Sequence, residues 1–253
     1  MNNEETKNKM SKMKLWGMLR VFSTLLETKS NDGMTIDESL AYLIDAEWDE
    51  RFNRKLYRLI EQARFRHKAK IEELTYEKTR NLDKGQIIRL SSCDWINKGE
   101  NIIITGPTGV GKSFLGCALG YQACLNGYKV MYSNCMKLFS RLKLAKADGT
   151  LIKEIEKIKS KNMLIIDDFG MEILDINSRL ILLEIMEDRY DKHSTVFTSQ
   201  LPPEQWHEII GDLTIADAIC DRLIHNSHRI ELEGPSMRKK IKKDSGQNLP
   251  PGN

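Results

Sequence analysis

Eight consecutive residues of this sequence match the spacing G-x-x-x-x-G-K-[ST], which is typical of loops that bind nucleotide phosphates. Glycines let the backbone N–H groups curl around phosphate oxygens, and a helix expected from Lys112 onward would add its positive amino-terminal end. In such loops the lysine reaches the β- and γ-phosphates, and the serine hydroxyl ligates Mg²⁺. The predicted phosphate loop therefore consists of Gly106, Pro107, Thr108, Gly109, Val110, Gly111, Lys112 and Ser113.

Two acids follow an apolar run, 163–166, that has the pattern of a buried strand. A carboxylate at the end of a strand beside a phosphate loop can hold Mg²⁺, usually through water. We predict this role for Asp167, and we predict that Asp168 orients and partly deprotonates an attacking water. The run 168–170 also spells the DFG motif of protein kinases, but no H-R-D loop precedes it, so we set that alternative aside.

Further polar residues could complete this site. The strand expected after the acidic pair ends in Ser199 and Gln200, and either side chain could contact the γ-phosphate or the water. Arg222 is expected on a helix, and Arg238 follows it. Taken alone, each arginine would be an ordinary surface residue. Because they follow the phosphate loop and the acidic pair in the sequence, both arginines are candidates for contacts with the nucleotide.

Short apolar runs alternate with helical patterns from Asn101 onward. The expected strands cover 101–105, 129–133, 163–167, 195–199 and 229–232. The expected helices cover 112–126, 136–147, 151–160, 177–191 and 214–226. This alternation predicts an α/β fold in which a parallel five-stranded sheet has helices on both faces, giving three layers.

The first third of the sequence has a helical pattern and no strand pattern before about residue 87. Apolar residues recur at helical spacing over 12–28, and Thr35 with Glu38 predicts a capping box at the start of a second, long helix. We therefore expect a small all-helical domain at 1–80 and the nucleotide-binding domain at 81–240. A disordered basic and polar tail is expected at 241–253.

The distribution of charge says more about partners than the total, which is only +3. Residues 51–70 contain eight basic side chains and one acid. Four of these basic residues share one helix face and could neutralise DNA phosphates, although a solvated helix face explains them equally well: Arg51, Arg54, Lys55 and Arg58. A second candidate face carries Lys137 and Arg141, for which an ordinary amphipathic helix is an equal alternative.

The bulk sequence excludes a membrane protein and a disulfide-rich one. Its apolar runs are shorter than the roughly 18–20 residues of a membrane span, and its polar N-terminus lacks a signal-peptide core. Five scattered cysteines fit a reducing compartment. We expect a cytoplasmic protein that does not interact with membranes.

The motifs together resemble the AAA+ superfamily, and within it the DnaC/IstB branch, over about residues 12–240. The sequence 92–96 before GPTGVGKS, the Asp-Asp-Phe-Gly sequence 167–170 and the run 198–203 carry this resemblance. The start containing 46–48, followed by an arginine-rich helix, resembles the IstB family. Members of that family are ATPases encoded by insertion sequences, and they assist a separate transposase.

The resemblance implies particular roles for the residues of this site. It implies ATP and Mg²⁺ as cofactors, Asp167 as the metal carboxylate and Asp168 as the catalytic acid, where most AAA+ proteins have Glu. Gln200 or Ser199 would be sensor 1, Arg222 an arginine finger that reaches a neighbouring subunit's ATP, and Arg238 sensor 2. Little chain follows Arg238, so no full C-terminal lid domain is expected.

The resemblance also implies a function. A homo-oligomeric ring or filament would bind double-stranded DNA when loaded with ATP and recruit the transposase of the same element, and DNA-stimulated hydrolysis would reset it. One alternative is a DnaC-like loader that acts on a replicative helicase. Another is a non-hydrolysing DNA-binding scaffold that binds ATP only as a structural ligand.

Overall fold

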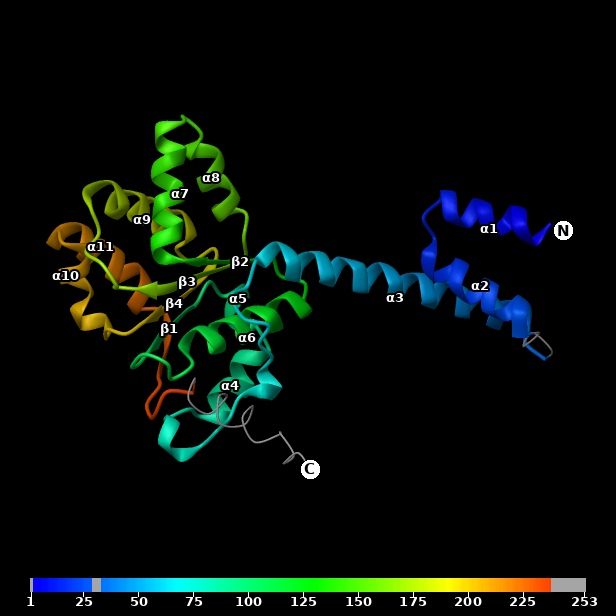
Figure 1. Ribbon diagram of the computed structural model, residues 1–253, viewed down its shortest axis with the longest axis horizontal. Coiled ribbons are helices and arrows are strands. Elements are labelled where there is room, and N and C mark those ends of the chain that lie inside the picture. Colours follow the sequence, from blue (N-terminus) through cyan, green and yellow to red (C-terminus); the bar gives the residue numbers. More distant parts are fainter. Residues whose placement is uncertain (1, 29–32, 238–253) are drawn as a thin grey trace, which may run out of the picture. The chain divides into compact units, whose positions relative to one another are not determined.

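The computed structural model describes residues 2–28 and 33–237 of the chain. The chain divides after Arg58 into two compact units, called unit 1 (1–58) and unit 2 (59–253) below. Among the described residues unit 1 is helical, and the strands all belong to unit 2 (Figure 1). In these same residues no helix has both the length and the apolar character needed to cross a bilayer. The tail expected at 241–253 lies outside the described residues.

Unit 1 consists of α1 (Asn3–Lys12), α2 (Trp16–Thr28) and most of α3 (Ile36–Ala63). The capping box predicted before α3 is confirmed, because the Thr35 N–H donates to Glu38 Oε2 over 2.7 Å and the Glu38 N–H donates to Thr35 Oγ1 over 3.3 Å. The α1 helix was not predicted, since its sequence, NEETKNKMSK, offers no apolar periodicity.

Glu47 of α3 holds the beginning of α2. Its buried carboxylate accepts hydrogen bonds from the backbone N–H groups of Gly17, over 2.8 Å, and Met18, over 3.3 Å. These donors have no partner inside the helix, and a carboxylate at this end also interacts favourably with the helix dipole. A side chain on Gly17 would collide with the backbone of Ala46, so the two helices can cross this closely only with glycine at this position.

The remaining apolar residues of α3 lie largely on its surface. Leu40, Ile44, Trp48 and Phe52 recur every fourth residue, and all four are exposed, Trp48 by 69%. The apolar period thus predicted the helix correctly. It does not correspond to burial inside unit 1.

Unit 2 is built on a parallel sheet with the strand order β2-β3-β4-β1-β5. Its strands are β1 (Asn101–Thr105), β2 (Val130–Asn134), β3 (Met163–Phe169), β4 (Ser194–Ser199) and β5 (Ser227–Glu231). All five predicted strands are present. Because the strands are parallel, their carboxyl ends gather at one edge of the sheet.

Helices cover both faces of this sheet (Figure 1). Successive strand residues point to opposite faces, so Ile102 and Ile104 belong to one apolar core and Ile103 to the other. The first core also contains residues of α4 (Lys84–Ser91), α5 (Asp94–Asn97) and α6 (Lys112–Leu125). The second contains residues of α7 (Cys135–Ala147), α8 (Leu151–Lys159), α9 (Ile176–Arg189), α10 (Trp206–Ile210) and α11 (Leu213–Ile224). The three-layer arrangement is therefore confirmed.

The expected domain boundary after residue 80 falls inside unit 2. Leu59 and Ala63, at the end of α3, are buried in the first core together with Leu74 and Leu82. Residues 59–82 include two short 3-10 helices, Ile71–Glu73 and Lys78–Arg80, and they pack with the sheet-containing unit. A helical pattern alone could not reveal which core would bury these side chains.

Candidate nucleotide-binding site

The predicted phosphate loop connects β1 to α6. Gly106, Gly109 and Gly111 have φ angles of 139°, 86° and 103°, which residues with a side chain rarely adopt. A Cβ on Gly106 would also collide with the backbone oxygen of Leu232, directly after β5. Glycine is thus required by the shape of this loop, and successive N–H groups in such loops form an anion-binding hollow.

Lys112 begins α6 and is almost completely buried. Its Nζ donates hydrogen bonds to the carbonyl oxygens of Gly106, over 2.6 Å, and Pro107, over 2.8 Å. The ammonium group therefore lies against the loop, beside the amino-terminal end of a 14-residue helix. Both the charge and the helix dipole favour an anion here.

The acidic pair lies at the carboxyl end of β3, next to this loop. Asp167 is fully buried, and its Oδ1 accepts a hydrogen bond from Ser113 Oγ over 2.7 Å. The hydroxyl groups of Thr198 and Tyr132 also donate to this carboxylate. Burial and the bond to Asp167 raise the pKa of Tyr132 well above its usual range, so the phenol stays protonated and remains a donor.

Asp168 differs from its neighbour in both backbone and exposure. The pairing of β3 with β4 is irregular between Ile166 and Phe169, and Asp168 has a φ of 59°. Its backbone N–H donates to Thr198 Oγ1 over 3.0 Å, and Asn134 Nδ2 donates to its Oδ2 over 3.1 Å. The side chain is 29% exposed, so this carboxylate can reach solvent where that of Asp167 cannot.

Four residues that contact the acidic pair were missed from the sequence: Arg66, Tyr132, Asn134 and Thr198. A signal existed for the last two, because each is a polar residue near the carboxyl end of a strand that neighbours β3. Nothing in the pattern distinguished Tyr132 from an ordinary strand residue.

The structure separates the two sensor 1 candidates. Ser199 is buried, donates to the carbonyl oxygen of Phe169 over 2.8 Å and accepts from the Leu201 N–H over 3.0 Å. Gln200 is exposed and lines the cavity beside the phosphate loop. Of the two, Gln200 is the side chain that faces this cavity.

A cavity of about 430 Å³ lies beside the loop. One wall is the phosphate loop with Lys112, Ser113 and Phe114. The other comes from the segment before the sheet, including His67, Leu74, Thr75 and Arg80, and Met237 also lines it. This volume lies within the usual range for small-molecule sites, and apolar walls beside a phosphate loop suit a nucleoside. No motif in the sequence indicated that 67–80 would contribute.

Arg80 joins the two walls of this cavity. Its Nη2 donates to the carbonyl oxygen of Val110 over 2.7 Å, and its Nη1 donates to Thr75 Oγ1 over 2.7 Å. Burial lowers the pKa of this guanidinium, which nevertheless remains charged at neutral pH. Arg80 thus braces the phosphate loop against the preceding segment.

The oxygen atoms at this site fit a magnesium ion. Ser113 and Asp167 offer hard oxygen donors 2.7 Å apart, directly after the loop. Within 2–28 and 33–237 there is no cluster of three or more His, Cys, Asp or Glu side chains that could hold a metal by themselves. That is compatible with Mg²⁺, which usually keeps water and takes substrate phosphates as ligands.

Arg222 does not join this site. It lies on α11 near the amino ends of the strands, because the Asn101 side chain at the start of β1 donates to its carbonyl oxygen over 3.2 Å. Its guanidinium donates to Ala218 O and Glu187 Oε1 over 2.7 and 3.0 Å. Arg222 is therefore at the opposite edge of the sheet from its own phosphate loop. Arg238 lies outside the described residues.

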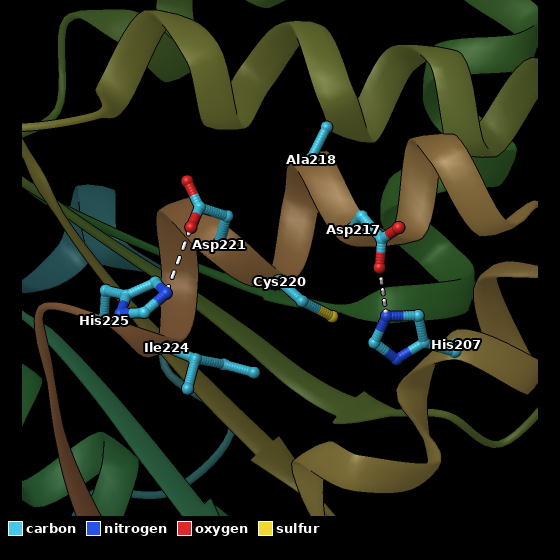
Figure 2. Close-up of a pocket in the computed structure, with 7 residues that line it drawn as sticks. All are labelled: His207, Asp217, Ala218, Cys220, Asp221, Ile224 and His225. Carbon is cyan, nitrogen blue, oxygen red and sulfur yellow. Dashed lines mark hydrogen bonds and ion pairs between the residues drawn. The ribbon is translucent and has the colours of Figure 1, made fainter.

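A separate pocket lies on the surface of α11 (Figure 2). His207 pairs with Asp217 over 2.9 Å, and His225 pairs with Asp221 over 3.1 Å, on either side of Cys220. The two pairs are separate in Figure 2 and do not converge on one point. Residues of α11, its C-cap residue His225 and His207 of α10 line this pocket, and no residue of the phosphate loop does.

The four basic residues of α3 are not equivalent. Arg51 Nε lies 2.7 Å from Glu47 Oε1, and Arg54 lies 3.7 Å from Glu47 and from Glu50. Lys55 and Arg58 are exposed and form no ion pair with any described residue. The positive charge available to a partner on this helix therefore comes mainly from the latter two.

The two residues of the second basic face, Lys137 and Arg141, also differ in their surroundings. Arg141 on α7 lies 3.5 Å from Glu154 on α8, whereas Lys137 is exposed and has no acidic partner among the described residues. Both helices lie between β2 and β3 in the chain, and β2 is an outer strand of the sheet.

A protein-family model described as "IstB-like ATP binding protein" matches residues 8–245. An insertion sequence ATP-binding protein of Sinorhizobium fredii, named y4pL, is 43% identical over 240 residues, covering 95% of this chain and 98% of the relative. The corresponding protein of insertion sequence IS21 from Pseudomonas aeruginosa is 28% identical over 237 residues, covering 94% and 89%.

Solved structures share the fold at lower identity. The AMPPCP-bound DnaA of Aquifex aeolicus superposes with a TM-score of 0.58 at 20% identity, over 74% of this chain and 57% of DnaA. The crystal structure of DnaI superposes with a TM-score of 0.56 at 22% identity, over 67% and 90%. The DnaC helicase loader gives 0.53 at 18%, over 65% and 97%. These likenesses establish the P-loop AAA+ fold.

Proposed function

The chain belongs to the family of IstB-like ATP binding proteins, and we propose that it is an Mg²⁺-dependent ATPase that oligomerises on double-stranded DNA and assists the transposase of an insertion sequence. Binding of ATP follows from the family. We further propose that the chain hydrolyses ATP, forms oligomers, binds DNA and assists a transposase.

The observation that carries the proposal is the meeting of Lys112, Ser113 and the acidic pair at one edge of the sheet. The lysine ammonium lies against the phosphate loop, and Ser113 contacts Asp167 over 2.7 Å. Asp168 lies beside them with a partly exposed carboxylate. This set can bind a triphosphate and also activate water, whereas a purely structural nucleotide site needs no exposed acid.

Each residue has a defined task in this mechanism. Ser113 and Asp167 would hold Mg²⁺, which supplies Lewis-acid stabilisation of charge on the phosphate oxygens. Lys112 neutralises charge on the transferred phosphoryl group. Asp168 would accept a hydrogen bond from the attacking water and orient it. Gln200 lines the same cavity and would contact the terminal phosphate or that water.

The position of Arg222 supports assembly. It lies at the sheet edge opposite its own phosphate loop, so it can contact a phosphate only in another copy of the chain. Such a contact is heterologous, since one face of each subunit meets a different face of the next, and it produces a ring or a filament. We infer that Arg222 exchanges its ion pair with Glu187 for the neighbour's ATP.

DNA and the transposase are inferred from the relatives and from charge. The relatives named above belong by name to insertion sequences, which favours a role in transposition over helicase loading. The likeness to DnaC and DnaI concerns the fold alone at 18–22% identity. Lys55, Arg58 and Lys137 are exposed cations without acidic partners among the described residues, which suits phosphate contacts that ignore sequence.

Replacing Lys112 with alanine tests the nucleotide site itself. We expect Lys112→Ala to lose ATP binding because the charge beside the loop is gone, while the fold survives. Affinity for a fluorescent ATP analogue and thermal melting would be measured for the variant and the parent, with Lys129→Ala as a control on a lysine outside the site. If Lys112→Ala keeps parental affinity, the loop does not bind the triphosphate as proposed.

A further inference from the structure

The segment that follows α3 brings one arginine into the nucleotide-binding site. Arg64 has a φ of 56°, which ends the helix and turns the chain. The next residues pack against α6: a Cβ on Gly120 would lie 2.6 Å from the Phe65 ring, and Ala69 is buried beside Cys117. The backbone of this segment is thus positioned by apolar contacts on both sides of residue 66.

Arg66 makes ion pairs with both acids of the site. Its Nη1 lies 3.1 Å from Oδ2 of Asp168 and 3.4 Å from Oδ2 of Asp167. In the part of the chain that the structure describes, no other Lys or Arg pairs with either aspartate. The Arg66 side chain is 43% exposed, so it can move away without opening the core.

The guanidinium of Arg66 contacts Oδ2 of Asp167, and Ser113 Oγ contacts Oδ1 of the same carboxylate. Two carboxylates this close repel each other, and a guanidinium between them offsets that repulsion. A magnesium ion would need the same carboxylate of Asp167, because hard oxygen atoms are its preferred ligands. Two cations bound to the same carboxylate repel each other, so each should weaken the binding of the other.

We propose that Arg66 is a positioning residue that holds Asp167 and Asp168 as a pair and competes with Mg²⁺ for them. This rests on the proposed function, since it presupposes Mg²⁺ and ATP at this site. Loading of the metal would then shift the Arg66 side chain away from the two carboxylates.

The test is a titration of Mg²⁺ in the presence of a non-hydrolysable fluorescent ATP analogue, with full-length protein. Binding, and not turnover, is the readout. Arg66→Gln should lower the Mg²⁺ concentration at the midpoint by about tenfold, as expected for removing one cation within 4 Å of a metal ligand. Arg66→Lys keeps the charge and should stay closer to the parental midpoint.

Arg64→Gln is the matched control. It removes the same charge two residues away, from a side chain without an acidic partner among the described residues. Its midpoint should be parental.

The outcomes separate this inference from the function on which it rests. In the parent, Mg²⁺ must strengthen binding of the analogue; if it does not, the proposed function fails and the inference falls with it. If it does, but Arg66→Gln and the parent share one midpoint, only the inference is overturned. An equal shift of the Mg²⁺ midpoint in Arg64→Gln overturns the inference as well, because the shift would then come from the loss of any nearby positive charge.

Discussion

At the scale of single residues, Asp167 is where the site comes together. Its buried carboxylate collects donors from the start of α6, from β2 and from β4. The sequence predicted Asp167, Asp168 and the phosphate loop, because those residues follow one another in a short motif. It could not predict Tyr132 or Arg66, which reach Asp167 across 35 and 101 positions of sequence, since only the packing of unit 2 brings them there.

The five cysteines allow a pH prediction at this scale. Burial raises the pKa of their thiols, to about 11 for three and about 12 for two, against 9.0 for a free thiol; they are Cys93, Cys117, Cys220, Cys124 and Cys135. Above pH 9 the unfolded chain loses thiol protons that the folded chain keeps. Stability from this source is therefore complete below about pH 9 and is lost as the pH rises toward 11 to 12.

Urea denaturation at pH 8, 9, 10 and 10.5 checks this prediction, with a decreasing free energy of unfolding as the expected result. A thiol reagent at pH 8 should react with the folded protein only slowly and with all five thiols after denaturation. Rapid reaction of five thiols in the folded protein would contradict the burial on which the prediction rests.

At the scale of elements, most of unit 2 could be predicted from the sequence. Strands β1 to β4 contain apolar runs that end at a turn or a polar residue, so the sequence predicted their limits to within two residues. The limits of β5 were also predicted to within two residues, although Ile230 is its one apolar residue. The predictions failed where the pattern did not carry the information. The polar α1 helix has no apolar period, and the apolar stripe of α3 did not indicate exposure.

Arg189, at the end of α9, makes the contacts between secondary-structure elements that we expect to contribute most to stability. Its guanidinium is buried and donates to the carbonyl oxygens of Ile158, Lys161 and Ser194 and to Thr195 Oγ1. It therefore ties α8, α9 and the start of β4 together, and replacing it would leave several buried acceptors without a donor.

Arg189→Met should lower the free energy of unfolding by about 3 kcal/mol, because the hydrogen bonds from a charged donor disappear and the orphaned acceptors stay desolvated. Urea denaturation measures the change. Arg89→Met is the control: that side chain is exposed, and its replacement should cost less than about 0.5 kcal/mol. A similar small effect for both variants would show that the buried guanidinium is dispensable.

At the scale of the whole molecule, the proposed function joins a nucleotide site in unit 2 to DNA and to further copies of the chain. The exposed cations of α3 are the first point to test. Lys55→Gln with Arg58→Gln should weaken binding to duplex DNA, and the slope of log K against log salt should fall by roughly 0.9 for each phosphate that the protein no longer neutralises. Basal ATPase activity should not change.

This double variant tests DNA contacts more specifically than a variant that also replaces Arg51 and Arg54. Those two pair with Glu47 and Glu50, so their removal would leave the buried Glu47 carboxylate poorly compensated and could disturb α2. Lys12→Gln with Lys14→Gln removes the same charge from another part of unit 1 and serves as the control. Equal salt slopes for the parent and both double variants would exclude this face and direct attention to Lys137.

The proposed function depends above all on hydrolysis at an interface between copies, with Asp168 from one subunit and Arg222 from the next. The decisive experiment is phosphate release from Mg²⁺·ATP, with and without DNA, by the parent, Asp168→Asn, Arg222→Ala and an equal mixture of the two variants. Both variants should bind ATP, and each alone should be inactive. The mixture should regain activity, since about a quarter of the heterologous interfaces would contain both intact residues. A parent that binds ATP but releases no phosphate, or a mixture as inactive as its components, would refute shared hydrolysis between subunits.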